Sequence, residues 1–543
     1  MSGTLWRNTL FCDPFYSFLS IRDDHQPWLW RIGEDSKSMG KRIAGFFRSD
    51  LGVLVLIAAA CMLLHIATNG QYGFHRDELQ TLDDARHLDW GFVAYPPITP
   101  LIGHVELILF GTSLTGFRVF SAFAVSMIMV LTGLIAKELG GNRHVIVLAA
   151  VAAGIAPVSL AQGAVFQYVS LDYLWGVAVT YLLVRLLKSE DPRFWVPIGA
   201  TLGLGMETRY TMGFLTLGII GAVLITSARR FLRSGWLWLG VGTSILVFLP
   251  NLIWQMEHHF ISLEFLSYLH ARDLRQGRYG GFFPEQLLTC VNFVTAPLSL
   301  LGLWFYFVQQ HDRRYRFLGW MFVVSFTLFA LAGSRSYYTA PLYPMLLAAG
   351  SVLLGNWLAA LRTMWSRVVY GVQWTAVLIG GVTFALLVMP VAPIGSKIWR
   401  VTAKLHDQFR EEIGWPDLAH AVAGVYGSLS PEERERTGIL VGNYGEAGSL
   451  NLYGQALGLP HAMSLTNSFW YRGYDPRLPQ TVILAGFDLD QGRKLFGSCV
   501  VAAKNSNPFG VENEESRDHP DILLCRNLRM PWPVYWEHFR RFG

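Results

Sequence analysis

Four ionisable residues follow one another just after the first long apolar segment of the sequence. They are His75, Arg76, Asp77 and Glu78, within the string YGFHRDEL. A carboxylate near the anomeric carbon of a sugar can accept the proton of an attacking hydroxyl, and a phosphate leaving group needs cations or a metal ion. Adjacent carboxylates point in different directions, so only one of the two can be the base. The alternative is that these charges only mark the end of a membrane span.

The composition indicates that the elements around this cluster lie in a membrane. Hydrophobic residues make up 52% of the 543-residue chain and charged residues only 15%, with a mean hydropathy of +0.33. A soluble protein would be about 25% charged, and charge is costly in hydrocarbon. The 19 Trp residues suit aromatic belts at two membrane interfaces. We therefore expect membrane lipid, and no nucleic acid, as a partner.

Eleven segments are apolar enough to be predicted as membrane spans. A span needs about 20 mostly apolar residues, and fewer suffice inside a bundle. The fifth and sixth segments are short, and the alternative is one broken helix. The predicted spans are 51–68, 115–137, 145–162, 170–187, 194–207, 211–227, 236–254, 286–308, 317–333, 340–361 and 368–389. The predicted fold class is mainly α, a polytopic membrane module over 51–390 followed by a small α/β domain over 391–543.

The positions of Lys and Arg predict the orientation of these spans. Short cytoplasmic loops carry an excess of both residues. Here they occupy alternate loops, at Lys41, Arg42, Arg48, Lys137, Arg143, Lys188, Arg193, Arg229, Arg230, Arg233, Arg313, Arg314, Arg316, Arg362 and Arg367. This predicts an inner (plasma) membrane protein with residues 1–50 in the cytoplasm and 391–543 outside. Because GKRIAGFFRSD follows Met39 as a basic lead-in, residues 1–38 are expected to be a loose tail or to precede the true start.

Two exported loops and the C-terminal region carry their own elements. In the first loop, 69–114, the strings ELQTLDDARHL and PLIGHVELILFG predict two helices lying on the membrane. The second loop, 255–285, predicts a surface helix and a Gly-rich turn. In 391–543, TGILVGNY and TVILAGFD predict buried strands. If this region is exported, Cys499 and Cys525 could form a disulfide.

The first loop resembles that of a known group of enzymes. FHRDEL, the following helix and AYPPITPLI are similar to the first exported loop of the GT-C glycosyltransferases. Within them the chain resembles glycosyltransferase family 39, which includes protein O-mannosyltransferases and lipid A aminoarabinose transferases. The resemblance implies a GT-C fold, Asp77 as the catalytic carboxylate and Glu78 as its neighbouring acid. Pro96 and Pro97 fit the pattern, but Tyr95 stands where some relatives have a basic residue.

Two further segments extend the resemblance and suggest how a lipid phosphate is held. Arg209, in LGLGMETRYTM, stands where relatives have Lys or Arg, and Arg335, in SRSYYTAPLYP, stands where they have Lys. The predicted topology places both on the outer side, against the positive-inside trend, and a phosphate would explain them. Arg76 and Tyr338 are further candidates for the donor phosphate. The alternative is that the arginines end spans and that the tyrosine belongs to an interfacial belt.

The remaining candidates concern a metal ion and the acceptor. Some family members use a divalent cation and others use none, so the cofactor stays open; Glu78, His258 and His259 are the candidate ligands, and ordinary surface histidines are the alternative. In GNYGEAG, Asn443 and Glu446 predict a turn, since the glycines do not fit G-x-G-x-x-G. With Trp470, whose ring could stack on a sugar, they form a candidate acceptor-binding surface.

The predicted function is an inverting glycosyltransferase that uses a polyprenyl-phosphate sugar on the outer face of the membrane. The acceptor is a hydroxyl or phosphate of a protein, a glycolipid or a cell-envelope glycan. The alternatives are a transporter or flippase of the lipid-linked sugar, or a non-catalytic scaffold. Transporters favour internal repeats and polar groups at mid-membrane. The sequence shows neither, because its polar residues cluster at one set of loops.

Overall fold

Long apolar helices form the first part of the chain. The computed structural model describes residues 45, 49–278, 280–309, 313–361 and 363–543, so most of the predicted cytoplasmic segment and its Met39 lead-in lie outside the described residues. Seven described helices are long and apolar enough to cross a membrane, or eight if a pair bent by 101° counts as one span. They are α2 (Asp50–Thr68), α6 (Val119–Glu138), α9 (Tyr168–Ser189), α12 (Gly235–Glu257), α16 (Arg316–Leu331) together with the 3-10 turn Arg313–Tyr315, α17 (Tyr343–Ala360) together with the 3-10 helix Ser336–Leu342, and α18 (Thr363–Val388).

The predicted count of eleven spans is not confirmed, although each predicted segment contains helix. The other four segments hold shorter or broken helices: α7 (Arg143–Gly154) with α8 (Pro157–Gln162), α10 (Trp195–Met206), α11 (Met212–Ile225), and α14 (Phe282–Thr289) with α15 (Ala296–Phe307). The break before α8 has a simple cause. Pro157 stands in its first turn, and a proline there cannot donate to the preceding helix.

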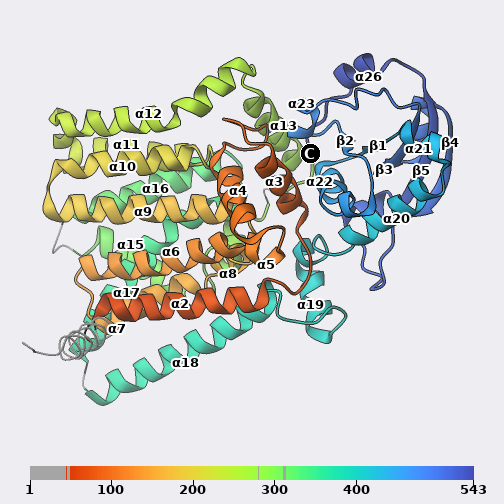
Figure 1. Cartoon of the computed structure of the whole chain (residues 1–543). Coiled ribbons are helices and arrows are strands. Elements are labelled where there is room, and N and C mark those ends of the chain that lie inside the picture. Colours follow the sequence, from red (N-terminus) through yellow and green to blue (C-terminus); the bar gives the residue numbers. More distant parts are fainter. Residues whose placement is uncertain (1–44, 46–48, 279, 310–312, 362) are drawn as a thin grey trace, which may run out of the picture. The chain divides into compact units, whose positions relative to one another are not determined.

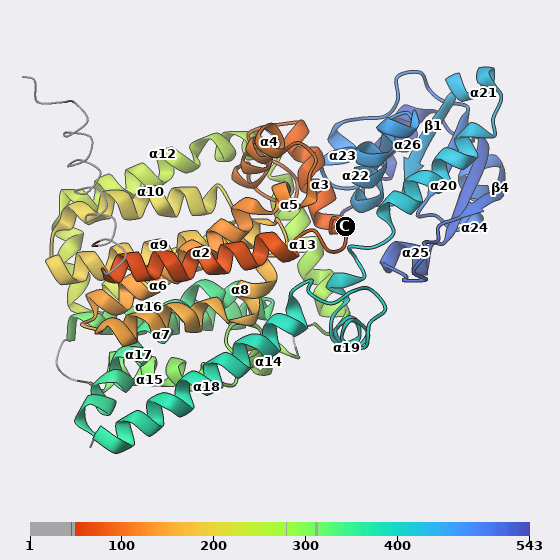
Figure 2. The same cartoon turned by 60° about the horizontal axis from the view of Figure 1, so that its bottom comes forward.

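The outer helices of the bundle expose apolar side chains. Leu63, Leu246 and Leu378 are each more than 60% exposed, and the apolar windows of α2, α12 and α18 are mostly unburied. Monomeric soluble proteins rarely expose contiguous apolar patches of this kind, whereas lipid tails are a favourable environment for them. The bundle is therefore that of a multi-pass membrane protein. In Figure 1 its long helices run side by side, and in Figure 2 α18 lies along its margin.

Both predicted loops contain the helices expected of them. The first holds α3 (Arg76–Arg86), α4 (Ile98–Phe110) and α5 (Leu114–Phe117), and the second holds α13 (Ile261–Arg275) followed by a glycine turn. With α19 (Lys397–Leu405), these helices lie at the end of the bundle nearest the strands in both views (Figures 1 and 2). Short 3-10 helices complete the connections: η1 (Pro192–Phe194), η2 (Ser227–Arg233), η3 (Arg313–Tyr315), η4 (Ser336–Leu342), η5 (Asp407–Phe409) and η6 (Gln455–Leu457).

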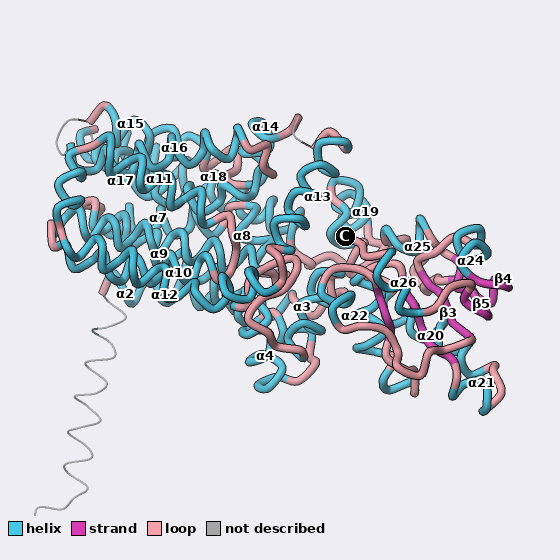
Figure 3. The backbone as a smooth tube through the Cα atoms, turned by 90° about the horizontal axis from the view of Figure 1, so that it is seen from above, coloured by secondary structure: helices cyan, strands magenta, loops and turns pink. Residues whose placement is uncertain are grey.

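The C-terminal region is built on a five-stranded mixed sheet in the order β2-β1-β3-β5-β4. β1 (Thr437–Val441) pairs in parallel with β2 (Ala462–Ser464) and β3 (Thr481–Ala485), whereas β5 (Asp521–Leu528) is antiparallel to β3 and β4 (Phe496–Lys504). Both strands expected to be buried, β1 and β3, are fully buried. Figure 3 shows this sheet apart from the helical bundle.

Helices cover both faces of the sheet. One face packs against α20 (Trp415–Gly427) and α22 (Tyr444–Tyr453), and the other against α26 (Trp532–His538). Smaller helices connect the strands: α21 (Pro431–Glu435), α23 (Ser468–Tyr471), α24 (Leu489–Leu495) and α25 (Glu514–Asp518). Cys499 and Cys525, which face each other on β4 and β5, form a disulfide, a pairing that the sequence left open.

The contact between α3 and α22 joins the first loop to the C-terminal region. Leu79 and Leu82 of α3 share a hydrophobic core with Ala447 and Leu450 of α22. A Cβ at Gly448 would lie 2.5 Å from the backbone oxygen of Leu79, so only glycine lets the two helices come this close. Gly448 of GNYGEAG therefore serves helix packing.

Candidate active site

The acidic pair lies in the first turn of α3. His75 is the N-cap residue, and its Nδ1 accepts a hydrogen bond from the Asp77 amide at 3.2 Å. Glu78 reaches back and accepts from the His75 amide at 2.8 Å, which completes a capping box. Burial lowers the pKa of His75, which agrees with an unprotonated Nδ1. The start of the helix thus fixes the direction of both carboxylates and places negative charge where the helix dipole favours it.

Glu78 is a structural residue in this arrangement. Its side chain is 0% exposed and makes a two-point ion pair with Arg118, with Nε–Oε1 at 2.8 Å and Nη2–Oε2 at 2.6 Å. Oε1 also accepts from the Phe166 amide at 2.7 Å. Arg118 is equally buried and lies 3.4 Å from Glu412 of the C-terminal region. With its oxygens occupied by these donors, Glu78 anchors the loop and has no acceptor site left for a substrate.

Asp77 has a different environment, although it is the next residue. Its carboxylate is 39% exposed. Oδ2 accepts from the side-chain amide of Gln167 at 3.0 Å, and Oδ1 accepts from the hydroxyl of Tyr444 at 2.8 Å. These contacts come from the start of α9 and the start of α22, so three elements distant in sequence hold one carboxylate. The group is oriented and still accessible, as a base that meets a substrate must be.

The electrostatic surroundings keep Asp77 ionised. Burial acts to raise its pKa, but nearby charges and the Tyr444 hydroxyl outweigh it, so that the pKa lies below the usual 3.8. Arg76 and Arg335 are among these charges. Asp77 is therefore a carboxylate at neutral pH, able to accept a hydrogen bond from a hydroxyl.

A pocket of about 270 Å³ lies beside this carboxylate and contains the two predicted arginines. Arg209, Arg335 and Tyr338 all line it, together with Tyr168 and Asp273. Gln167, which donates to Asp77, is the chain neighbour of Tyr168. The residue that contacts the Asp77 carboxylate and a residue that lines the pocket are therefore adjacent in the chain.

Arg209 is a buried cation surrounded by aromatic rings. Its guanidinium lies 4.0 Å from the ring centre of Tyr338, 4.7 Å from that of Tyr168 and 5.5 Å from that of Tyr337. The side chain is 9% exposed, and its nearest carboxylate, Asp172, is 3.7 Å from Nη1. Within the described ranges Nη1 has no hydrogen-bond partner. Stacking on π faces stabilises the charge but gives Nη1 no hydrogen-bond acceptor.

Arg335 is held by a carboxylate at the same pocket. Its Nε and Nη2 donate to the two oxygens of Asp273 at 2.9 and 3.0 Å, a two-point pair that fixes the plane of the guanidinium. Asp273 belongs to α13, so the second predicted loop supplies one wall of the pocket. The arginine remains 32% exposed and can still meet a second anion.

Arg76 is not among the residues that line this pocket, and its role at the donor phosphate stays a prediction. Its Nη1 lies 2.5 Å from Glu514 and 3.5 Å from Glu515, both in α25. Arg76 and Asp77 are adjacent in the first turn of α3, so their side chains point to different sides of the helix. Arg76 therefore ties the first loop to the C-terminal region.

The candidate acceptor surface is also occupied by structural contacts. Asn443 caps α22 and donates to Glu515 at 2.9 Å, and Glu446, 1% exposed, accepts from the Gly442 and Asn443 amides. The predicted turn is thus a helix cap. Trp470 donates from Nε1 to the Trp536 carbonyl at 2.8 Å, and Arg540 lies over its ring, so one face and the polar edge of the ring are already in contact with the protein.

The three candidate metal ligands do not meet one another among the described residues. The group there that could hold a metal ion consists of Asp83, His87 and His461. Glu78 is engaged with Arg118, and His258 stacks on Trp254 with ring centres 3.9 Å apart. Glu78 thus lies at the buried start of α3, and His258 lies in an aromatic stack after α12.

Several residues of the site carry no sequence signal of their role. Tyr444 and Gln167, which hold Asp77, are far from it in the chain, as are Arg118 from Glu78 and Asp273 from Arg335. Tyr444 lies inside GNYGEAG, a string that stands out for its glycines. The sequence could indicate that Tyr444 is a polar residue near the start of a helix, but it could not indicate that Asp77 is its hydrogen-bond partner.

The fold and this arrangement define a polytopic membrane protein of the GT-C type. Residues 94–254 match the family model for dolichyl-phosphate-mannose-protein mannosyltransferase. The structure is similar to ArnT from Cupriavidus metallidurans bound to undecaprenyl phosphate, at 14% identity and a TM-score of 0.51, over 87% of this chain and 97% of that one. The apo state of the same protein gives 12% identity and a TM-score of 0.52 over the same shares.

A mycobacterial arabinofuranosyltransferase, AftD, is similar at 15% identity and a TM-score of 0.52, over 87% of this chain and 40% of that larger one. No curated protein sequence matches the chain. The resemblance stated from the sequence is confirmed at the level of the GT-C fold, and the family match covers the stretch from the end of the first loop to the seventh predicted span.

Proposed function

We propose that the protein is an inverting glycosyltransferase that moves a sugar from a polyprenyl-phosphate donor to a hydroxyl or phosphate acceptor. The family match over 94–254 and the GT-C fold support transfer of a lipid-linked sugar in general. The finer assignment of donor, acceptor and residues rests on the geometry of the pocket and of Asp77.

The observation that carries this proposal is the environment of Arg209. A guanidinium that is 9% exposed and only loosely paired with Asp172 is costly unless an anion completes its hydrogen bonds. Its side chain lines a pocket that Arg335 also lines. Two arginines at one pocket suit a phosphate, since the guanidinium fork matches phosphate oxygens. Undecaprenyl phosphate, to which the similar ArnT structure is bound, has this chemistry.

Asp77 is the residue that we assign to the acceptor. The acceptor oxygen attacks the anomeric carbon on the side opposite the phosphate, the bond from that carbon to the phosphate oxygen breaks, and the configuration inverts. A hydroxyl acceptor gives its proton to Asp77, and polyprenyl phosphate leaves as an anion held by Arg209 and Arg335. Because the pKa of Asp77 is low, its carboxylate mainly orients the hydroxyl, and the proton moves late. A phosphate acceptor needs no deprotonation.

We place the reaction on the outer face of the inner (plasma) membrane, with the N-terminus in the cytoplasm and the sheet region outside. The distribution of Lys and Arg favours this orientation. The disulfide between Cys499 and Cys525 supports it, because disulfides persist in oxidising compartments. A lipid-linked donor suits this location, where nucleotide sugars are absent.

A reconstitution experiment tests this function against a flippase. The purified chain is placed in proteoliposomes with a labelled polyprenyl-phosphate sugar and a membrane extract as acceptor source. A transferase releases unlabelled polyprenyl phosphate and moves the label to a new product. Movement of intact labelled lipid between leaflets, with no new product, would instead establish transport and reject the proposal.

A further inference from the structure

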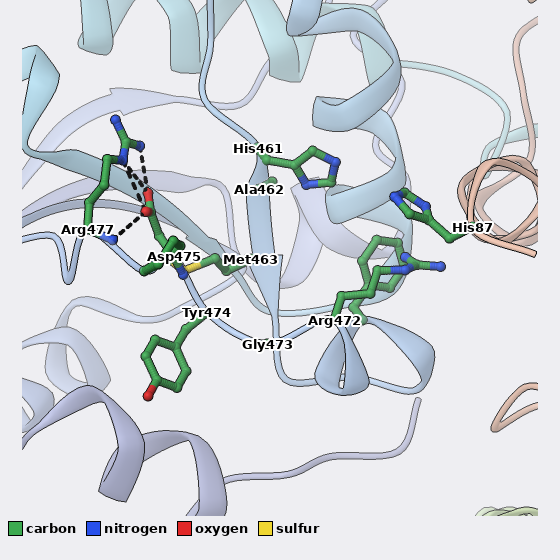
Figure 4. Close-up of a pocket in the computed structure, with 11 residues that line it drawn as sticks. His87, His461, Ala462, Met463, Arg472, Gly473, Tyr474, Asp475 and Arg477 are labelled. Atoms are coloured by element: carbon green, nitrogen blue, oxygen red, sulfur yellow. Dashed lines mark hydrogen bonds and ion pairs between the residues drawn. The ribbon is translucent and has the colours of Figure 1, made fainter.

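A second pocket lies at the end of α3 opposite to Asp77. It has a volume of about 590 Å³ and shares no lining residue with the pocket of Arg209. Figure 4 shows His87 and His461 facing each other across it, with Arg472 below. His87 follows the end of α3, whereas His461 immediately precedes β2. Both histidines are exposed.

Asp83 supplies a buried carboxylate oxygen to this place. The side chain is 1% exposed. Oδ2 accepts from Arg472 Nη1 at 2.7 Å and from the Asn451 amide at 3.3 Å. Oδ1, by contrast, has no hydrogen-bond partner in the part of the chain that the structure describes. Burying such an oxygen costs free energy unless a donor or a cation completes it.

The two histidines are placed as metal ligands commonly are. His87 is four residues after Asp83, so both side chains lie on one face of α3. Its Nδ1 lies 2.8 Å from the backbone carbonyl of Asp83 and 3.5 Å from Asp83 Oδ1, and in the tautomer that donates from Nδ1 to the carbonyl the lone pair is on Nε2. Ligating histidines typically make this bond from their second nitrogen. One ligand atom each from Asp83, His87 and His461 lies within 4.8 Å of the others.

We propose that Asp83, His87 and His461 bind one divalent transition-metal ion of the zinc type. Two imidazoles and one carboxylate suit zinc, cobalt or nickel, whereas magnesium and calcium prefer an all-oxygen set. The three protein ligands leave at least one coordination position open toward the pocket. The net charge is suitable, because the carboxylates of Asp83 and Asp84 face one nearby guanidinium, that of Arg472.

The position of this site gives it a consequence for the rest of the molecule. Asp83 and His87 belong to the first loop and His461 to the sheet region, so the ion joins the two parts. The joined helix is α3, whose first turn carries Asp77. Metal binding therefore stabilises the folded chain and fixes the end of the helix opposite the acidic pair.

The test measures metal binding directly and does not depend on any transferase activity. The full chain is purified in detergent, treated with EDTA, and titrated with ZnCl₂ or CoCl₂ alone. We expect one ion per chain by elemental analysis, a visible absorption band with Co²⁺, and a rise in Tm on adding Zn²⁺. Loss of a histidine that only supports a ligand typically weakens metal binding about 10- to 100-fold. His87→Ala and His461→Ala should each weaken it at least as much.

Two matched variants serve as controls. His420→Ala removes an exposed histidine of α20, and His258→Ala removes a histidine of the rival set suggested by the sequence. Both should bind the ion as the unchanged chain does. Because His87 and His461 are exposed, their variants should keep the Tm of the EDTA-treated chain. Absence of stoichiometric metal, binding that survives in both His87→Ala and His461→Ala, or binding lost in His258→Ala would each overturn the proposal.

Discussion

The hydroxyl of Tyr444 donates a hydrogen bond of 2.8 Å to Oδ1 of Asp77, across 367 positions of sequence. Tyr444 is the first residue of α22, and Asp77 lies in the first turn of α3. The helices can meet because Gly448 has no side chain to separate them. The sheet region thus completes the environment of a carboxylate that belongs to the first membrane loop.

Replacement of Tyr444 by Phe should change the ionisation of Asp77. Hydrogen bonding to the charged form lowers a pKa, and the Tyr444 hydroxyl is one of the groups that hold the pKa of Asp77 below its usual value. In Tyr444→Phe we expect the acid limb of kcat/KM to move to higher pH and kcat to fall about ten-fold, in line with one charge-assisted hydrogen bond. The measurement is a pH profile of transfer from a lipid-linked donor.

The control for this change is Tyr426→Phe, which removes a hydroxyl that donates to the Arg434 carbonyl at 3.2 Å. The pH profile of kcat/KM for Tyr426→Phe should be the same as that of the unchanged chain. An acid limb of Tyr444→Phe that coincides with that of the unchanged chain would separate Tyr444 from the reacting carboxylate.

Arg209 should be sensitive even to a conservative change. Lysine keeps the charge but lacks the planar fork that both stacks between tyrosine rings and matches phosphate oxygens. We expect Arg209→Lys to lower kcat/KM for the donor at least ten-fold and Arg209→Ala to lower it about a hundred-fold or more. Steady-state kinetics with varied donor concentration gives these ratios.

Arg233→Ala, an exposed arginine in a different loop, is the matched control and should leave the kinetics unchanged. If Arg209→Ala kept the donor kinetics of the unchanged chain, the pocket would not be the phosphate site.

Glu78 should matter for stability. Removing one partner of a buried ion pair typically costs about 3–5 kcal/mol, because the other charge is left buried. In Glu78→Gln, Arg118 would keep its bonds to two backbone carbonyls, but its nearest carboxylate would be that of Glu412 at 3.4 Å. We expect a clear drop in Tm in detergent, whereas Asp77→Asn should melt close to the unchanged chain. Equal Tm values for Glu78→Gln and the unchanged chain would contradict the structural role.

Glu412 predicts how stability depends on pH. Burial raises its pKa to about 8, with Arg118 opposing the shift and Glu78 adding to it. Between pH 4.5, which is the usual pKa, and about pH 8, Glu412 holds a proton in the folded chain that it releases in the unfolded chain. Its contribution to stability is therefore present at low pH and lost as the pH rises through this window.

Glu412→Gln removes this titration. We expect the variant to be more stable than the unchanged chain at pH 9, by an amount on the order of 3 kcal/mol, and similar to it at pH 5. Thermal melts at several pH values measure the difference. Glu435→Gln, at an exposed position, is the control, and a Tm that falls equally with pH in Glu412→Gln would show that another group controls the loss.

Much of the fold could be predicted from local pattern. Apolar runs such as that of α2 and the alternating loops of Lys and Arg are local signals, and so are the strands β1 and β3. The number of spans was harder to predict from the sequence. Pro157 breaks one apolar run, and packing inside a bundle allows short helices such as α10.

For the site, the sequence predicted individual residues but not the contacts between them. Asp77, Arg209 and Arg335 stood out by type and by resemblance, and the structure places the two arginines at one pocket. Their partners did not stand out, because hydrogen bonds between Asp77 and Tyr444 or Gln167 depend on tertiary packing. The same limit explains why Glu446 and Trp470 were assigned to an acceptor surface, although they form a helix cap and a tryptophan contact.

The most direct measurement is transfer by Asp77→Asn. Asparagine keeps the size of the side chain and removes its ability to accept a proton. A positioned base typically contributes about 10²- to 10⁴-fold to a rate, so kcat for a hydroxyl acceptor should fall by that much. The Tm and the binding of the lipid-linked donor should stay unchanged. Asp490→Asn, at an exposed position of α24, is the control and should transfer normally. Full transfer by a folded Asp77→Asn enzyme would contradict the central claim that Asp77 is the catalytic carboxylate.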